Sequence, residues 1–142
     1  METAQPAIRQ ALVIDDDEGN RGVLRVLLTR AGYQVVSATD GQTGLAHLST
    51  QSFTLAFVDM RLPDMFGAQV VSAIRQAAPD AFIIAATMDD DPATMHAAFD
   101  AGCDMFLVKP YDVPQITQII HTAQRGQRWL ADRMGVRKYI GR

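Results

Sequence analysis

The chain has 142 residues, an ordinary globular composition and a formal net charge of −3, which suits one domain able to bury its own core. No apolar run approaches the roughly 20 residues that a membrane span requires. The first ten residues lack the basic and apolar regions of a secretory signal. The single cysteine, Cys103, excludes an internal disulfide. We therefore expect a cytoplasmic protein without membrane insertion.

The charge is unevenly distributed. Residues 1–124 hold 7 basic and 15 acidic side chains, whereas residues 125–142 hold 6 basic side chains and 1 acidic one. The acidic body argues against nucleic-acid binding. We expect one domain over residues 1–125 and a basic C-terminal extension over residues 126–142. Apolar residues such as Trp129 and Ile140 indicate that the extension continues the last helix or packs on the body.

The first half of the chain alternates short apolar runs with helical patterns. Residues 11–14 read as a buried strand, and the apolar residues at 24, 27, 28 and 31 have helical spacing before Gly32, a plausible helix stop. Residues 34–38 form a second predicted strand. Asp40 is placed to cap a helix that runs through Leu48.

The second half continues the same alternation. An apolar run from Phe53 ends in Asp59 and predicts the third strand, and a helical pattern covers residues 68–78. Residues 82–86 and 105–108 are the fourth and fifth predicted strands, with a helix from the Asp91-Pro92 pair to about residue 101 between them. Asp112 is placed to cap the last helix. Continuous apolar strands between helices predict a parallel sheet covered on both faces.

Polar side chains stand where four of these strands end. Asp15 and Asp16 follow the first strand, Asp59 the third, Thr87 the fourth and Lys109 the fifth. The carboxyl ends of parallel strands share one edge of the sheet, where open α/β proteins bind their ligands. These side chains are therefore expected to converge.

The expected cluster has the chemistry of a phosphoryl site. Two carboxylates 4 Å apart repel by about 4 kcal/mol at an effective dielectric of 20, and Mg²⁺ with its preference for oxygen ligands relieves that repulsion. Lys109 supplies a point charge suited to phosphate, and Thr87 supplies a hydroxyl. Asp59 then becomes a candidate nucleophile that forms an aspartyl phosphate.

At these positions the chain resembles the receiver domain of two-component response regulators, over about residues 9–125. The resemblance implies a flavodoxin-like, doubly wound, five-stranded parallel sheet with strand order 2-1-3-4-5. The residues that carry it are the run Leu12 to Glu18, the run Val58 to Pro63, Gly67, Thr87, Ala101-Gly102 and the run Phe106 to Pro110.

The resemblance also implies roles for individual residues. Asp59 is the phosphoacceptor. Asp16, Asp59 and the backbone carbonyl of Arg61 hold Mg²⁺, and Asp15 acts mainly through a bound water. Lys109 pairs with the phosphoryl group and Thr87 moves to hydrogen-bond it. Phe106 swings inward behind Thr87, which reshapes the surface of the helix over 92–101, the strand over 105–108 and the last helix.

Two positions depart from the family pattern. Met88 follows Thr87 where the family usually has a small residue, and we expect it to slow phosphoryl turnover. Asp89 lies in an acidic run, Asp89 to Asp91, and either pairs with Arg61 or belongs to a solvated loop.

The resemblance implies a signalling switch, and not an enzyme beyond its own phosphorylation and dephosphorylation. The donor would be a histidine kinase or a histidine phosphotransfer protein. Because the sequence ends a short way past the last helix, we expect no output domain and signalling by contact, including a homodimer through the reshaped face. The chain is alternatively a phosphorelay intermediate. A magnesium-dependent phosphohydrolase is disfavoured because Arg61 stands where that class has its second Asp, and a flavodoxin because acids follow the first strand.

Overall fold

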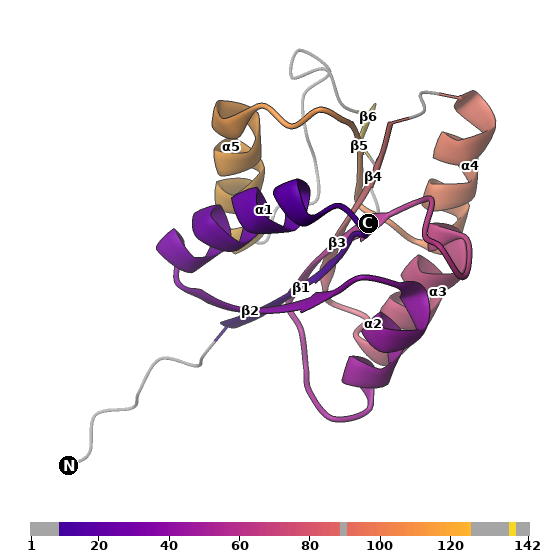
Figure 1. Cartoon of the computed structure of the whole chain (residues 1–142), viewed down its shortest axis with the longest axis horizontal. Helices are drawn as coiled ribbons and strands as arrows, with labels where there is room; N and C mark the ends of the chain where they lie inside the picture. The colour runs from indigo at the N-terminus through magenta and orange to yellow at the C-terminus, as the bar shows by residue number, and fades with distance from the viewer. Residues whose placement is uncertain (1–8, 89–90, 126–136, 139–142) are drawn as a thin grey trace.

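The computed structural model describes residues 9–88, 91–125 and 137–138, in which strands and helices alternate along the chain (Figure 1). In chain order the elements are β1 (Arg9–Ile14), α1 (Glu18–Arg30), β2 (Tyr33–Ala38), α2 (Gly41–Leu48), β3 (Leu55–Asp59), α3 (Gly67–Ala77), β4 (Phe82–Thr87), α4 (Pro92–Ala101), β5 (Met105–Val108), α5 (Val113–Gln124) and β6 (Arg137–Lys138). All the strands and helices predicted from the sequence are present. Among these residues, no helix is both long and apolar enough to cross a bilayer.

The sheet has the order β2-β1-β3-β4-β5-β6. Neighbouring strands from β2 to β5 are parallel, so the predicted order 2-1-3-4-5 is confirmed. Figure 1 shows the sheet between two layers of helices, with α1 and α5 on one side and α2, α3 and α4 on the other. The predicted doubly wound, flavodoxin-like fold is therefore present.

Each of the strands β1 to β5 supplies both halves of the core. In β3, Leu55 and Phe57 pack under α1 and α5, whereas Ala56 and Val58 pack under α2, α3 and α4. Successive side chains of a strand point to opposite faces. A strand covered on both faces must therefore be apolar throughout, which explains the continuous runs in the sequence.

The caps predicted at Asp40 and Asp91 are present, whereas the one predicted at Asp112 is not. Asp17, Asp40 and Asp91 stand before α1, α2 and α4, and each accepts a hydrogen bond from a backbone N–H of the first turn. Asp112 precedes α5, but its side chain accepts no such bond, so the predicted side-chain cap is wrong there. Pro114, in the first turn, has no N–H to donate.

Arg75, near the end of α3, clamps the edge of the sheet where the strands begin. Its guanidinium donates to the carbonyl oxygens of Pro79 at 2.8 Å and Ala81 at 2.7 Å, and twice to that of Gly102, at 2.8 and 3.0 Å. It also pairs with the buried Asp104 carboxylate at 2.7 Å. One side chain thus joins α3, the start of β4, the end of α4 and the start of β5.

Only two residues of the C-terminal extension are described. The helix α5 ends at Gln124, and residues 137–138 form β6, which pairs antiparallel with β5. Most of the extension, residues 126–136 and 139–142, lies outside the described residues. The division into a body over 1–125 and an extension stays a prediction.

Candidate functional site

Three carboxylates meet where β1 and β3 end. Ile14 and Val58 are register partners, so Asp15 and Asp59, one residue further along each strand, arrive at the same edge of the sheet. With Asp16, each offers a carboxylate oxygen, and these three atoms lie within 4.8 Å of one another. Asp15 and Asp59 are buried, whereas Asp16 is exposed.

Lys109 lies between two of these carboxylates. Its Nζ is 2.7 Å from Oδ2 of Asp15 and 3.1 Å from Oδ2 of Asp59. Burial acts to lower the pKa of Lys109, but the hydrogen bonds and charges of the two carboxylates outweigh it, and the pKa is raised. The backbone N–H of Lys109 donates to the Thr87 carbonyl at 2.8 Å, which fixes the end of β5 against the end of β4. The ammonium is therefore held, charged, at the centre of the site.

Asp59 is held in a partly dehydrated environment. Its pKa is raised, chiefly by burial and also by the charge of Asp15, while the Arg61 N–H and Lys109 oppose the rise. The Arg61 N–H donates to Oδ1 of Asp59 at 3.0 Å, and Lys109 donates to Oδ2. Both carboxylate oxygens are thus oriented by donors.

The polypeptide after β3 is shaped by a glycine. A Cβ on Gly67 would lie 2.3 Å from the Asp59 carbonyl oxygen and 2.5 Å from Cα of Met60. Backbone atoms cannot yield as a flexible side chain does, so only glycine fits. The Gly67 N–H donates to the Met60 carbonyl at 2.8 Å. Gly67, one of the residues that carried the family resemblance, therefore closes the loop that holds Asp59 and Arg61.

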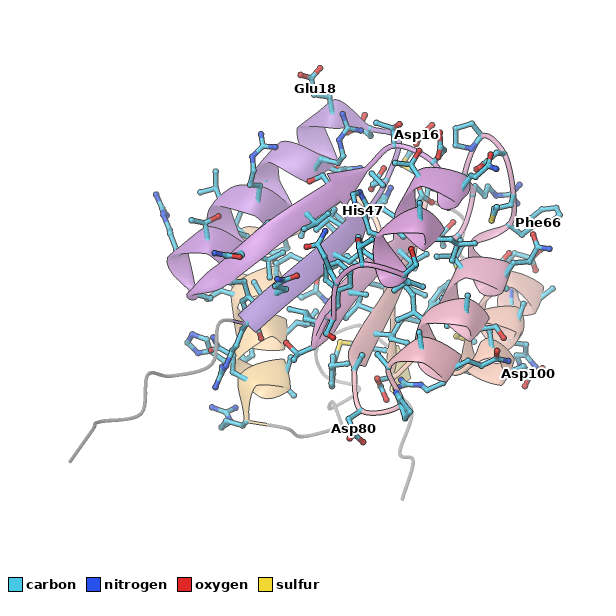
Figure 2. All side chains as sticks on the ribbon, turned by 90° about the horizontal axis from the view of Figure 1, so that it is seen from below. Asp16, Glu18, His47, Phe66, Asp80 and Asp100 are labelled. Carbon is cyan, nitrogen blue, oxygen red and sulfur yellow. The ribbon has the colours of Figure 1, made fainter. Side chains whose placement is uncertain are left out.

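The cluster opens into a cleft of about 430 Å³, lined by Asp16, Asp17, Asn20, Asp59, Arg61, Thr87, Met88, Lys109 and Pro110. Thr87 is fully buried, whereas Met88 is 78% exposed at the rim. Figure 2 shows Asp16 at one end of the molecule and Asp80 at the opposite end, which places the cleft where the strands finish. Asp17, Asn20 and Pro110 are lining residues that the sequence analysis did not assign to the site.

The remaining predicted residues have different outcomes. Phe106 is 3% exposed and its ring centre lies 6.4 Å from that of Phe99 in α4, so it is already packed inward in this conformation. Asp89 lies outside the described residues, and its predicted pairing with Arg61 stays a prediction. The backbone N–H of Arg61 contacts Asp59, while its carbonyl remains a predicted metal ligand.

The donor set fits a hard divalent cation. Lys109 carries one positive charge against three carboxylates, so a net negative charge remains to attract a cation. The clustered carboxylates and the predicted Arg61 carbonyl all offer oxygen, the ligand type that Mg²⁺ and Ca²⁺ prefer. The site therefore has the chemistry of an acidic cation site with the Lys109 ammonium beside the carboxylates.

The fold and site define a doubly wound α/β protein with an acidic cleft at the carboxyl ends of its strands. Residues 11–121 match the response regulator receiver domain family, and the chain belongs to that family. It is 34% identical over 107 residues to the CAI-1 autoinducer sensor kinase/phosphatase CqsS of Vibrio cholerae, covering 73% of this chain and 16% of that protein. It is 30% identical over 118 residues to the response regulator ArlR of Staphylococcus aureus, covering 83% of this chain and 53% of ArlR.

A solved structure extends the comparison to three dimensions. A response regulator protein from Burkholderia pseudomallei, solved with a phosphorylated aspartic acid, calcium ion and citrate, is 30% identical with a TM-score of 0.73. The match covers 82% of this chain and 69% of that one. The chain thus spans about a sixth of the length of CqsS and about half the length of ArlR.

Proposed function

We propose that the chain is a phosphorylation-dependent signalling switch in which Asp59 accepts a phosphoryl group from the phosphohistidine of a histidine kinase or a histidine phosphotransfer protein. The observation that carries this proposal is the placement of Asp59 at the cleft, with donors on both carboxylate oxygens and two further carboxylates beside it. The phosphorylated aspartic acid and calcium ion of the Burkholderia relative support it.

The transfer is an exchange of one bond to phosphorus for another. A carboxylate oxygen of Asp59 bonds to phosphorus as the P–N bond to the donor histidine breaks, and the electron pair stays on the imidazole. Asp15, Asp16, Asp59 and the Arg61 carbonyl would hold Mg²⁺, which when bound neutralises charge on the phosphoryl oxygens. Lys109, freed from Asp59, pairs with the phosphoryl group, and Thr87 hydrogen-bonds it.

The output is a shift between two conformations. Phosphorylation favours the conformation in which Thr87 has moved toward the site, because only that conformation makes the added contact. Phe106 is already packed inward and need not move. The surface formed by α4, β5 and α5, which we call the α4–β5–α5 face, then differs between the two states. We propose this face as the contact surface for a partner or for a second copy of the chain.

The test is incubation of the chain with a small phosphodonor, with and without Mg²⁺, followed by intact mass. Wild type gains one phosphoryl group only with Mg²⁺, and Asp59→Asn gains none. Asp80→Asn, at the opposite end of the molecule (Figure 2), is the matched control and behaves as wild type. Labelling without Mg²⁺, or labelling of Asp59→Asn, would contradict the mechanism.

A phosphorelay intermediate is the second candidate, and the similarity to part of a sensor kinase favours it. Such a protein returns its phosphoryl group from Asp59 to a histidine. Mixing the phosphorylated chain with a histidine phosphotransfer protein distinguishes the two roles. Phosphate that appears on histidine supports the relay, whereas phosphate released only to water supports the terminal switch.

Met88 is expected to prolong the phosphorylated state. Met88 lines the cleft and is exposed, so we expect its side chain to obstruct the approach of water to a phosphoryl group on Asp59. Met88→Ala should therefore dephosphorylate faster, by roughly two- to tenfold, which corresponds to at most about 1.4 kcal/mol of activation free energy. The decay of phosphorylated protein, followed by intact mass, measures this. Phe66→Ala, also exposed but not a lining residue of this cleft, is the control. Equal dephosphorylation rates for Met88→Ala and wild type would show that Met88 does not slow turnover.

A further inference from the structure

The outer edge of β5 is occupied by the chain's own C-terminal extension. On one side β5 pairs parallel with β4, and on the other it pairs antiparallel with β6 (Figure 1). Met105 is opposite Lys138 and Phe106 is opposite Arg137. Without these two residues β5 would be an edge strand, with backbone N–H and C=O groups available to another strand.

The extension reaches β5 from close by. The end of α5 lies near the start of β4, because Gln124 and Phe82 line the same pocket. Met105 begins β5 at this end of the sheet, opposite Ile84. Residues 125–136 connect α5 to β6, and a chain of this length spans up to about 40 Å when extended. The tether keeps β6 at a high effective concentration beside β5.

The pairing is nevertheless short. A ladder of two residues provides few backbone hydrogen bonds, and each contributes only modestly once water is a competitor. The covered and uncovered states then differ by no more than about a hundredfold in population. A contact of this strength is reversible, unlike the long ladders between β1, β3 and β4.

We propose that Arg137–Lys138 is a displaceable cover on the β5 edge, and that its removal lets β5 pair with the β5 of a second copy of the chain. An uncovered edge strand pairs readily with another edge, and two identical strands pair antiparallel about a two-fold axis. The cover of the β5 edge by Arg137–Lys138 depends on backbone hydrogen bonds alone. The second part rests on the self-association proposed above for the α4–β5–α5 face, and neither part requires phosphorylation of Asp59.

Two double variants of the full chain separate backbone pairing from charge. Arg137→Pro/Lys138→Pro removes both N–H groups and both charges, so no hydrogen bond can be donated to β5 whichever residue faces it. Arg137→Ala/Lys138→Ala removes the same charges and keeps both N–H groups. Hydrogen exchange of the amides of residues 105–108, measured in dilute protein, reports the cover. Sedimentation over a concentration series reports self-association.

Wild type and the double-alanine variant (the alanine pair) should protect the amides of β5 and remain monomeric. In the double-proline variant (the proline pair) these amides should exchange about tenfold faster, and the protein should dimerise as its concentration rises. Unchanged exchange in the proline pair would overturn the cover. Faster exchange in a proline pair that stays monomeric would overturn the role of the edge in self-association. If the Arg137→Ala/Lys138→Ala variant loses as much amide protection at residues 105–108 as the double-proline variant, side chains and not backbone hold the segment, which would overturn the cover as a backbone contact. Intact-mass labelling of Asp59 in the same samples tests the phosphorylation proposal separately.

Discussion

Replacing Arg75 by methionine is expected to lower the free energy of unfolding by about 3–5 kcal/mol, because it removes one partner of a buried ion pair. The Asp104 side chain has no exposed surface, and its Oδ2 accepts both the Arg75 guanidinium at 2.7 Å and the Ile83 N–H at 2.9 Å. Methionine fills similar space but donates nothing. The carbonyls of Pro79, Ala81 and Gly102 lose their Arg75 donor as well. For a domain whose total stability is about 5–15 kcal/mol, this is a large fraction.

Urea denaturation of the wild type and two further variants isolates the cause. Arg25→Met, on the exposed surface of α1, controls for loss of an arginine and should change stability little. Arg75→Met/Asp104→Asn removes the buried charge but keeps an oxygen for the Ile83 N–H, and should recover part of the loss. If the double variant is no more stable than Arg75→Met, the uncompensated carboxylate is not the source of the cost.

Lys109→Met is expected to destabilise the metal-free protein by a similar amount, about 3–5 kcal/mol near neutral pH, because two buried carboxylates lose their shared cation. Mg²⁺ should restore more stability to this variant than to wild type, since the ion no longer competes with an ammonium for Asp15 and Asp59. An ion at 100 times its dissociation constant adds about 2.7 kcal/mol. Phosphorylation of the variant should remain impaired, because nothing replaces the charge that Lys109 brings to the phosphoryl group.

Denaturation with and without Mg²⁺ measures these effects. Asp15→Asn in the Lys109→Met background removes one of the two repelling charges and should return part of the stability without metal. Asp80→Asn in the same background changes a distant carboxylate and should return none. Equal stabilisation by Mg²⁺ in wild type and Lys109→Met would contradict competition between the ion and the lysine.

Much of the site follows from local sequence signals. Asp15, Asp59, Thr87 and Lys109 each close an apolar run, and parallel strands bring such positions to one edge. The end of the helix at about residue 101 also follows, since Gly102 comes next and has a φ of 114°, which glycine adopts without strain. The Asp112 side-chain cap was wrong: Pro114 removes one of the two N–H groups that such a cap can bond, and the Asp112 side chain does not bond the other.

Other features carried no local signal. Arg75 and Asp104 are 29 residues apart in sequence, and neither stands in a motif that would pair it with the other. Met88 was singled out for its type, but its exposure at the rim depends on how the end of β4 meets the cleft. The pairing of residues 137–138 with β5 was not anticipated, because a two-residue strand leaves no periodic pattern.

The sequence by itself determined the order of strands and helices along the chain and the strand-end carboxylates, threonine and lysine that meet in the cleft, because period, capping and strand-end polarity are local properties. Only the tertiary structure decided which groups are buried, how Lys109 is shared between Asp15 and Asp59, that Arg75 joins four elements and that β6 covers β5. Those features depend on distances between residues remote in the chain, and such distances are set by packing and by closure of the sheet. Burial then changes the energetics, since a dehydrated ion pair is costly to break and a solvated one is not.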